Sequence, residues 1–380
     1  MSSFCSRLTC HFLLLGLFLQ IASCSSTSVA WRLLHYGDSD INDFKKFPYR
    51  KLKAADKPVD FAQSRTHLSD SCCVYNTGKL TLAAYLQKHN TLAFLVIRND
   101  TIRYEHYFDN YGKDSLIQAF SINKSIISLL IGCAIDDGLI GSEKDLVLKY
   151  LPELNGRGFD NITIEDLLMM RAPINYTENS NPFGLHARFY YTAKLEPNIL
   201  KLTARPKGKK KYSYRSAEVA LMSLILKRVL HGPTVTSYLQ QKVWTPLGME
   251  SPAEWTVDID NDTLGIEKSW CCLATTARDL ARIGKLYLDS GMANGWQIVS
   301  KDWIRKSVFD PLKLNADLVY NYNWWVYPKN HVFVAIGKDG QFIYVQPDTN
   351  TIVVRLGQNM GKLKRETWFS LFHNLTNGSY

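Results

Sequence analysis

Ser121 and Lys124 are the residues of this chain that could most readily act as a nucleophile and its base, because they stand three positions apart. Apolar residues recur behind them at helical spacing, and Gly138 follows as a stop signal, so the sequence predicts a helix that begins at Ser121. Residues three apart on a helix share a face, which brings the Lys124 amine to the Ser121 hydroxyl. The free N–H groups of the first turn would also suit a developing oxyanion. The spacing therefore indicates an activated serine.

The same motif also fits a plainer interpretation. A chain of this length contains about one S-x-x-K by chance, and this chain contains a single copy. On that interpretation Ser121 is a helix N-cap and Lys124 is solvated. The context of the motif, and above all a second motif further along the chain, decides between the two interpretations.

The second motif is Tyr214-Arg215-Ser216, the only Tyr-x-Ser or Tyr-x-Asn in the chain, placed directly before a helical pattern that ends near Leu230. Free lysine and tyrosine side chains both titrate near pH 10. Burial disfavours the charged lysine, and a nearby cation favours the phenolate. A cluster of serine, lysine and tyrosine could therefore move protons without a histidine, whereas on the plainer interpretation Tyr214 only packs at a helix entry.

With both motifs in place, the sequence resembles the serine hydrolases related to β-lactamases and penicillin-binding proteins. Ser121-x-x-Lys124 matches the first family motif, and Tyr214-x-Ser216 matches the second in its class C-like form. Stretches that carry no chemistry match as well, at 162–168, 244–249 and 275–284. The resemblance covers roughly residues 75–375 and is strongest to the branch of nylon-oligomer (6-aminohexanoate-dimer) hydrolases.

The resemblance implies a reaction and a site. Ser121 would attack an ester or amide carbonyl while Lys124 and Tyr214 shuttle its proton, and water would then hydrolyse the acyl-enzyme. The oxyanion and substrate would be held near Ile336, Gly337 and Ser216. The resemblance implies no metal and no organic cofactor, and a small-molecule ester or amide as the partner.

Three departures from the family pattern bear on the substrate. The Lys-Thr-Gly of the third motif corresponds to Ala335-Ile336-Gly337, Gly-Gly-Leu is replaced by Cys271-Cys272-Leu273, and Thr-Ser-Gly by Arg171-Ala172-Pro173. Without the lysine and threonine, an incoming carboxylate would be desolvated with weaker compensation, so uncharged substrates are expected. Two alternatives stay open: a non-catalytic sensor or scaffold of the penicillin-binding-protein type, and a D-Ala-D-Ala-type peptidase or β-lactamase.

The elements that must position these residues follow from the hydrophobic pattern. Residues 92–97 and 101–108 form a predicted β-hairpin, and strands are expected at 323–326, 332–336, 341–346 and 351–356. Helices are expected at 214–230, 275–288 and 366–374. Strands at both ends with helices between them predict an α+β fold, namely a β-lactamase-like antiparallel core sheet flanked by helices, in a domain at 71–380 with a helical insertion at about 139–260.

The amino terminus has the features of a targeting signal. Arg7 precedes an apolar run that is too short to span a bilayer, so residues 1–23 are interpreted as a signal peptide. Ile21-Ala22-Ser23-Cys24 resembles the lipobox of bacterial lipoproteins, which predicts a lipid on Cys24 and a protein anchored in the bacterial envelope, facing the periplasm. Ordinary cleavage and secretion is the alternative. Residues 24–70 are expected to form a tether and an extension that wraps the domain.

Charge and cysteines add weaker constraints. The net charge of +10 would suit an anionic partner, but no nucleic-acid-binding signature is present, and the basic run at 207–211 is expected to be a solvated loop. The adjacent pairs Cys72-Cys73 and Cys271-Cys272 lack metal-ligand spacing. A disulfide between the two pairs is one open pairing, whereas Cys133 is expected in the core. The sequence does not indicate an oligomeric state.

Overall fold

The computed structural model describes residues 29–64, 80–179, 181–261 and 264–378. The predicted signal peptide, the predicted lipid attachment at Cys24, and Cys72 and Cys73 lie outside the described residues. Within those residues, no helix is long and apolar enough to cross a membrane.

One large sheet carries most of the strands. Its order is β10-β11-β12-β13-β14-β3-β4-β2, and every neighbouring pair is antiparallel except the parallel pair β2 and β4. The strands are β2 (Ala62–Gln63), β3 (Thr91–Arg98), β4 (Thr101–Tyr107), β10 (Val319–Asn321), β11 (Trp324–Tyr327), β12 (Val332–Gly337), β13 (Gln341–Gln346) and β14 (Thr351–Gly357).

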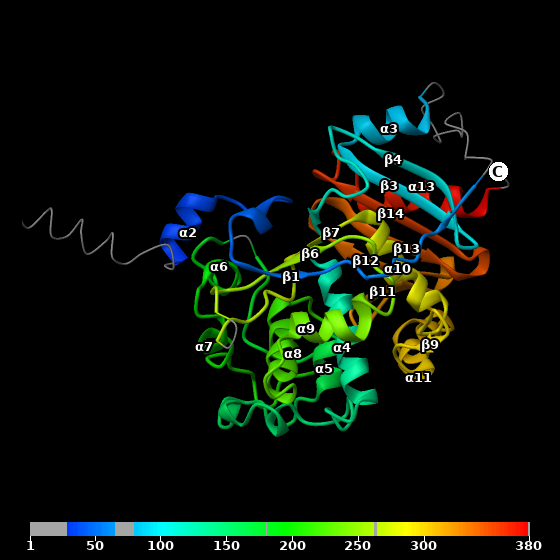
Figure 1. Cartoon of the computed structure of the whole chain (residues 1–380). Coiled ribbons are helices and arrows are strands. Elements are labelled where there is room, and N and C mark those ends of the chain that lie inside the picture. The colour runs from blue at the N-terminus through cyan, green and yellow to red at the C-terminus, as the bar shows by residue number, and fades with distance from the viewer. Residues whose placement is uncertain (1–28, 65–79, 180, 262–263, 379–380) are drawn as a thin grey trace, which may run out of the picture.

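Helices cover both faces of this sheet. Because side chains alternate along a strand, Phe94 and Val96 of β3 pack toward α3 (Leu82–Lys88) and α13 (Arg365–Asn377), whereas Leu95 and Ile97 join the larger core on the other face. That larger core includes α4 (Ile122–Asp136) and α10 (Ala277–Leu288). Figure 1 shows α4, α5, α8 and α9 gathered below the sheet.

The predicted helical insertion contains α5 (Ile164–Leu168), α6 (Leu185–Tyr191), α7 (Leu195–Ile199), α8 (Ser216–Val229) and α9 (Val235–Leu239). Beside it lies a small sheet of order β1-β6-β7-β5, formed by Tyr49–Leu52, Ala253–Thr256, Leu273–Thr275 and Ile117–Gln118. The remaining elements are short: α2 (Val29–Tyr36), β8 (Met292–Ala293), β9 (Trp296–Gln297), α11 (Lys301–Ile304) and α12 (Asp310–Leu312).

The α+β prediction is confirmed, as are the hairpin at 92–108, the four carboxyl-terminal strands and the helix at 275–288, to within two or three residues. The amino-terminal extension joins both sheets, because β1 pairs with β6 and β2 pairs with β4. Its Phe47 and Leu52 are part of the larger core. The described part of the extension is therefore integrated into the fold.

Candidate active site

The candidate nucleophile stands at the point where a short strand turns into a buried helix. β5 leads to Phe120, whose φ of 48° is a left-handed conformation that non-glycine residues adopt at a cost, and α4 begins directly after Ser121. Residues 122–134 of α4 are all buried, whereas Ser121 is partly exposed. The Ser121 side chain makes no capping hydrogen bond. Its hydroxyl is therefore available for chemistry at the accessible end of a rigid helix.

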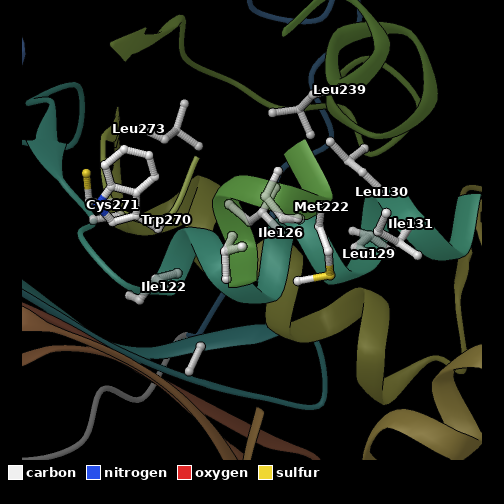
Figure 2. Close-up of a cluster of buried hydrophobic side chains, with 14 of the residues drawn as sticks. Ile122, Ile126, Leu129, Leu130, Ile131, Met222, Leu239, Trp270, Cys271 and Leu273 are labelled. Atoms are coloured by element: carbon white, nitrogen blue, oxygen red, sulfur yellow. The ribbon is translucent and has the colours of Figure 1, made fainter. Parts of the chain in front are cut away.

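A packed apolar environment fixes this helix in place. Figure 2 shows Ile126 and Leu129 of α4 close to Met222 of α8, with Trp270 and Cys271 at the end of the cluster where Ile122 lies. Such packing holds the first turn of α4 rigidly, as a catalytic geometry requires.

Lys124 directs its amine at the serine. Its Nζ lies 2.8 Å from Ser121 Oγ and 3.0 Å from the Trp270 carbonyl oxygen, to which it donates. The side chain is 1% exposed, and this burial lowers the pKa of Lys124 to about 8, against a smaller opposing effect of the Glu178 charge. Ser121 does stand at the N-cap position of α4, but Lys124 is buried, so the expectation of a solvated lysine is wrong.

Tyr214 completes the cluster. The Lys124 amine lies 4.9 Å from the centre of the Tyr214 ring, which stacks on Trp325 at 5.9 Å and meets Tyr320 edge-on at 5.9 Å. Burial raises the pKa of Tyr214, and a hydrogen bond with Ser121 offsets part of that rise. The structure thus brings Ser121, Lys124 and Tyr214 together, with the phenol held in its protonated form.

Ser216 has a partner that the sequence analysis missed. Ser216 is fully buried, and its hydroxyl donates to Glu178 Oε1 at 2.6 Å while its backbone N–H donates to Glu178 Oε2 at 2.8 Å. Ser216 is the first residue of α8, with Arg215 as the N-cap, and its hydroxyl is engaged by Glu178.

Glu178 itself lies within the electrostatic reach of the cluster. Burial raises the pKa of Glu178, but its interactions with His186 and Ser216 and the charge of Lys124 outweigh burial and bring the pKa to about 2. The carboxylate is therefore ionised. No motif surrounds Glu178 in the sequence, and the only signal for it is that a helix start such as Ser216 favours a nearby anion.

The third-motif strand ends beside the nucleophile. A Cβ added to Gly337 would lie 2.4 Å from the Ala119 carbonyl oxygen, so only glycine permits this approach to the segment before Ser121. Ile336 precedes it on β12 and pairs with Phe342. The next residue, Lys338, places its amine 5.5 Å from the centre of the Phe120 ring. Ile336 and Gly337 thus belong to the strand that meets the site, and their role toward an oxyanion stays a prediction.

The vicinal pair Cys271 and Cys272 forms a disulfide, and this corrects the open pairing with Cys72 and Cys73. The backbone turns at this pair, and the Cys272 N–H donates to the Lys268 carbonyl oxygen. The buried Asn123 amide, in the orientation that satisfies its neighbours, accepts from the Cys272 and Leu273 N–H groups at 3.0 and 2.7 Å. Cys133 is buried with a free thiol, as expected.

Two remaining features are the basic run at 207–211 and the residues that could bind a metal ion. The basic run at 207–211 is exposed as predicted, although Lys210 pairs with the buried Asp166 carboxylate at 2.5 Å. In the part of the chain that the structure describes, no group of three or more His, Cys, Asp or Glu side chains could hold a metal ion.

Comparisons with known proteins agree with this geometry. The family model described as beta-lactamase matches residues 81–369. The 6-aminohexanoate-dimer hydrolase of Paenarthrobacter ureafaciens is 27% identical over 293 residues, which cover 71% of this chain and 73% of that protein.

Solved structures share the fold at low sequence identity. A Bacillus anthracis protein, provisionally assigned as a 6-aminohexanoate-dimer hydrolase, has a TM-score of 0.76 at 20% identity over 89% of this chain and 92% of its own. A class C beta-lactamase in complex with cefoxitin has a TM-score of 0.57 at 14% identity over 78% of this chain and 96% of its own.

Proposed function

Because this chain belongs to the β-lactamase family of hydrolases, as the match over residues 81–369 shows, we propose that it cleaves an ester or amide through an acyl-enzyme on Ser121. The observation that carries the proposal is the Lys124 amine, which is buried and lies 2.8 Å from Ser121 Oγ. An amine with a lowered pKa at this distance is suited to accept the serine proton.

Lys124 and Tyr214 have separate roles in moving the serine proton to the leaving group. Neutral Lys124 accepts the proton of Ser121 as Oγ attacks the carbonyl carbon, and the C–O or C–N bond to the leaving group then breaks. The Tyr214 hydroxyl donates its proton to the leaving group and regains one from the protonated Lys124, whose amine lies over its ring. Water, with its proton taken along the same route, hydrolyses the acyl-enzyme. The backbone N–H groups of Ser121 and of β12 near Ile336 stabilise the oxyanion.

The substrate we propose is uncharged near the scissile bond. Ala335 and Ile336 stand where the family carries a lysine and a threonine, so a carboxylate would meet neither a cation nor a hydroxyl from those positions. The relatives that are named 6-aminohexanoate-dimer hydrolases support an amide substrate. An ester bond to the same acyl group is easier to break than the amide bond. Esters and amides therefore both fit the site.

Turnover of p-nitrophenyl butyrate tests the proposal. Ser121→Ala, Lys124→Ala and Tyr214→Phe should each lower kcat by about 100-fold or more, since each removes a group that acts on the reacting atoms. Ser128→Ala on the same helix is the matched control and should keep the wild-type rate. If Tyr214→Phe also kept that rate, Tyr214 would be a packing residue. Absence of turnover in the wild type with every ester and amide tested would favour the sensor or scaffold alternative.

A further inference from the structure

A cavity of about 380 Å³ adjoins the candidate site, and part of its lining comes from the amino-terminal extension. Leu33, Asp38 and Ser39 of the extension face it, together with Glu178 and Lys338 of the hydrolase domain. The family match begins at residue 81. One wall of this cavity is therefore built by a segment that precedes the residues matched by the family model.

The cavity borders the Tyr214-x-Ser216 motif and the end of the third-motif strand, β12. On one side Glu178 binds the hydroxyl and the backbone N–H of Ser216, and its charge acts on Lys124 and Tyr214. On the other side Lys338 directly follows Gly337, with its amine over the Phe120 ring. Glu178 and Lys338 both line the cavity, so it opens between the Tyr motif and the third-motif strand.

The extension is firmly attached where it forms this wall. Figure 1 shows α2 beside α6, and the buried Arg32 of α2 donates to the carbonyl oxygens of Tyr191, Thr192 and Asp258 at 3.1–3.4 Å. Lys338 donates to Ser39 Oγ at 2.9 Å. A wall held by several hydrogen bonds to the domain can shape a ligand, because little conformational freedom is lost on binding.

The geometry also indicates which part of a substrate enters the cavity. The leaving group must meet the Tyr214 hydroxyl, and the ring of Tyr214 packs against Trp325 and Tyr320, neither of which lines the cavity. The acyl group therefore extends toward the cavity. A volume of about 380 Å³ is within the range of ligand pockets and accommodates an acyl chain of about eight carbons. Leu33, Ala187 and Tyr190 supply apolar contact, and the carboxylates of Glu178 and Asp38 disfavour an anionic chain.

We propose that the amino-terminal extension forms the acyl-binding wall of the active site and that Leu33 limits the length of the uncharged acyl group that is accepted. This inference rests on the proposed function, since it assumes acylation of Ser121.

Leu33 and Leu34 provide a matched pair for the test. Leu33 lines the cavity, whereas its neighbour Leu34 on the same helix is 87% exposed. Leu33→Trp should fill the cavity and lower kcat/KM for p-nitrophenyl octanoate at least 10-fold, while p-nitrophenyl acetate changes less than 2-fold. Leu34→Trp should change neither substrate. An equal effect of Leu33→Trp on both esters, or none on octanoate, would overturn the proposal.

A second variant covers the case in which Leu33→Trp does not fold. Leu33→Ala enlarges the cavity and should raise the ratio of kcat/KM for the decanoate over that for the octanoate at least 3-fold, and an unchanged ratio contradicts the proposal. Ser121→Ala separates the two hypotheses. If hydrolysis depends on Ser121 but the chain-length ratios do not move, only the role of the extension is refuted. If hydrolysis does not depend on Ser121, the proposed function fails and this inference fails with it.

Discussion

Burial acts in opposite directions on the two proton-carrying side chains of the site. It lowers the pKa of Lys124 to about 8 and raises the pKa of Tyr214. Near neutral pH the cluster therefore holds an amine that can lose its proton readily and a phenol that keeps its own. In the proposed mechanism this difference assigns Lys124 as the base and Tyr214 as the acid, although both side chains titrate near pH 10 in water.

A pH profile tests this assignment at Lys124. Because the proposed mechanism requires the neutral amine, kcat/KM should rise with pH through an inflection near 8. Glu178→Gln removes the negative charge that favours protonated Lys124, so the inflection should move to lower pH. The other groups that face Lys124 are Ser121, the Trp270 carbonyl and Tyr214, and none of them changes in this variant.

The measurement is kcat/KM for p-nitrophenyl butyrate between about pH 6 and pH 10. Glu143→Gln is the control, since the buried Glu143 carboxylate pairs with Lys306 at 3.1 Å instead of acting on Lys124. It should leave the inflection in place. An inflection that does not move in Glu178→Gln, or that moves to higher pH, would show that the Glu178 charge does not raise the pKa of Lys124.

At the scale of elements, the turn between β10 and β11 holds the catalytic helix. Tyr322 and Asn323 have left-handed φ values of 46° and 64°. The Asn323 side chain donates to the Lys124 carbonyl oxygen at 3.1 Å, and the Ser125 hydroxyl donates to the Asn323 carbonyl oxygen at 2.7 Å. The turn thereby ties the core sheet to the first turn of α4.

Asn323→Ala should lower the free energy of unfolding by about 1–3 kcal/mol, because it removes two buried hydrogen bonds, to the Lys124 carbonyl oxygen and from the Tyr320 hydroxyl, and leaves an alanine in the left-handed region. Asn323→Gly loses the same hydrogen bonds but suits the backbone, so it should cost less than Asn323→Ala. Urea denaturation of the two variants compares them. A glycine variant less stable than the alanine variant would contradict the importance of the backbone conformation.

The local structure was predictable from periodicity and the overall fold from the family resemblance, but particular tertiary contacts were not. The hairpin at 92–108 and α10 have clear periodicity, and Ser121, Lys124 and Tyr214 stand in local motifs, so these features could be found. The role of Ser216 depends on Glu178, which lies 38 residues away in the chain. Likewise, hydrophobic periodicity does not predict the backbone turn at which Cys271 and Cys272 form a disulfide.

For the whole molecule, net charge is a poor guide to the charge at the site. The chain carries +10, yet the cavity that Glu178 shares with the amino-terminal extension is lined by the carboxylates of Glu178 and Asp38 against one lysine, Lys338. That lysine is held by Ser39. A substrate with a carboxylate near its scissile bond thus meets more repulsion than attraction here.

The expected consequence is a preference for uncharged substrates. The kcat/KM for p-nitrophenyl butyrate should exceed that for a chromogenic cephalosporin by at least 100-fold on one preparation, since the cephalosporin carries a carboxylate beside its β-lactam. Equal values, or an advantage for the cephalosporin, would mean that the missing lysine of the third motif has no effect on this chain.

The most direct test of the account is covalent labelling of the nucleophile. Intact mass spectrometry after treatment with a fluorophosphonate, which transfers one phosphonyl group to an activated serine, should show a single adduct per chain that maps to the peptide containing Ser121. The adduct should form on Ser128→Ala and be absent from Ser121→Ala. An adduct that persists in Ser121→Ala, or that maps to another peptide, would contradict the assignment of Ser121 as the nucleophile.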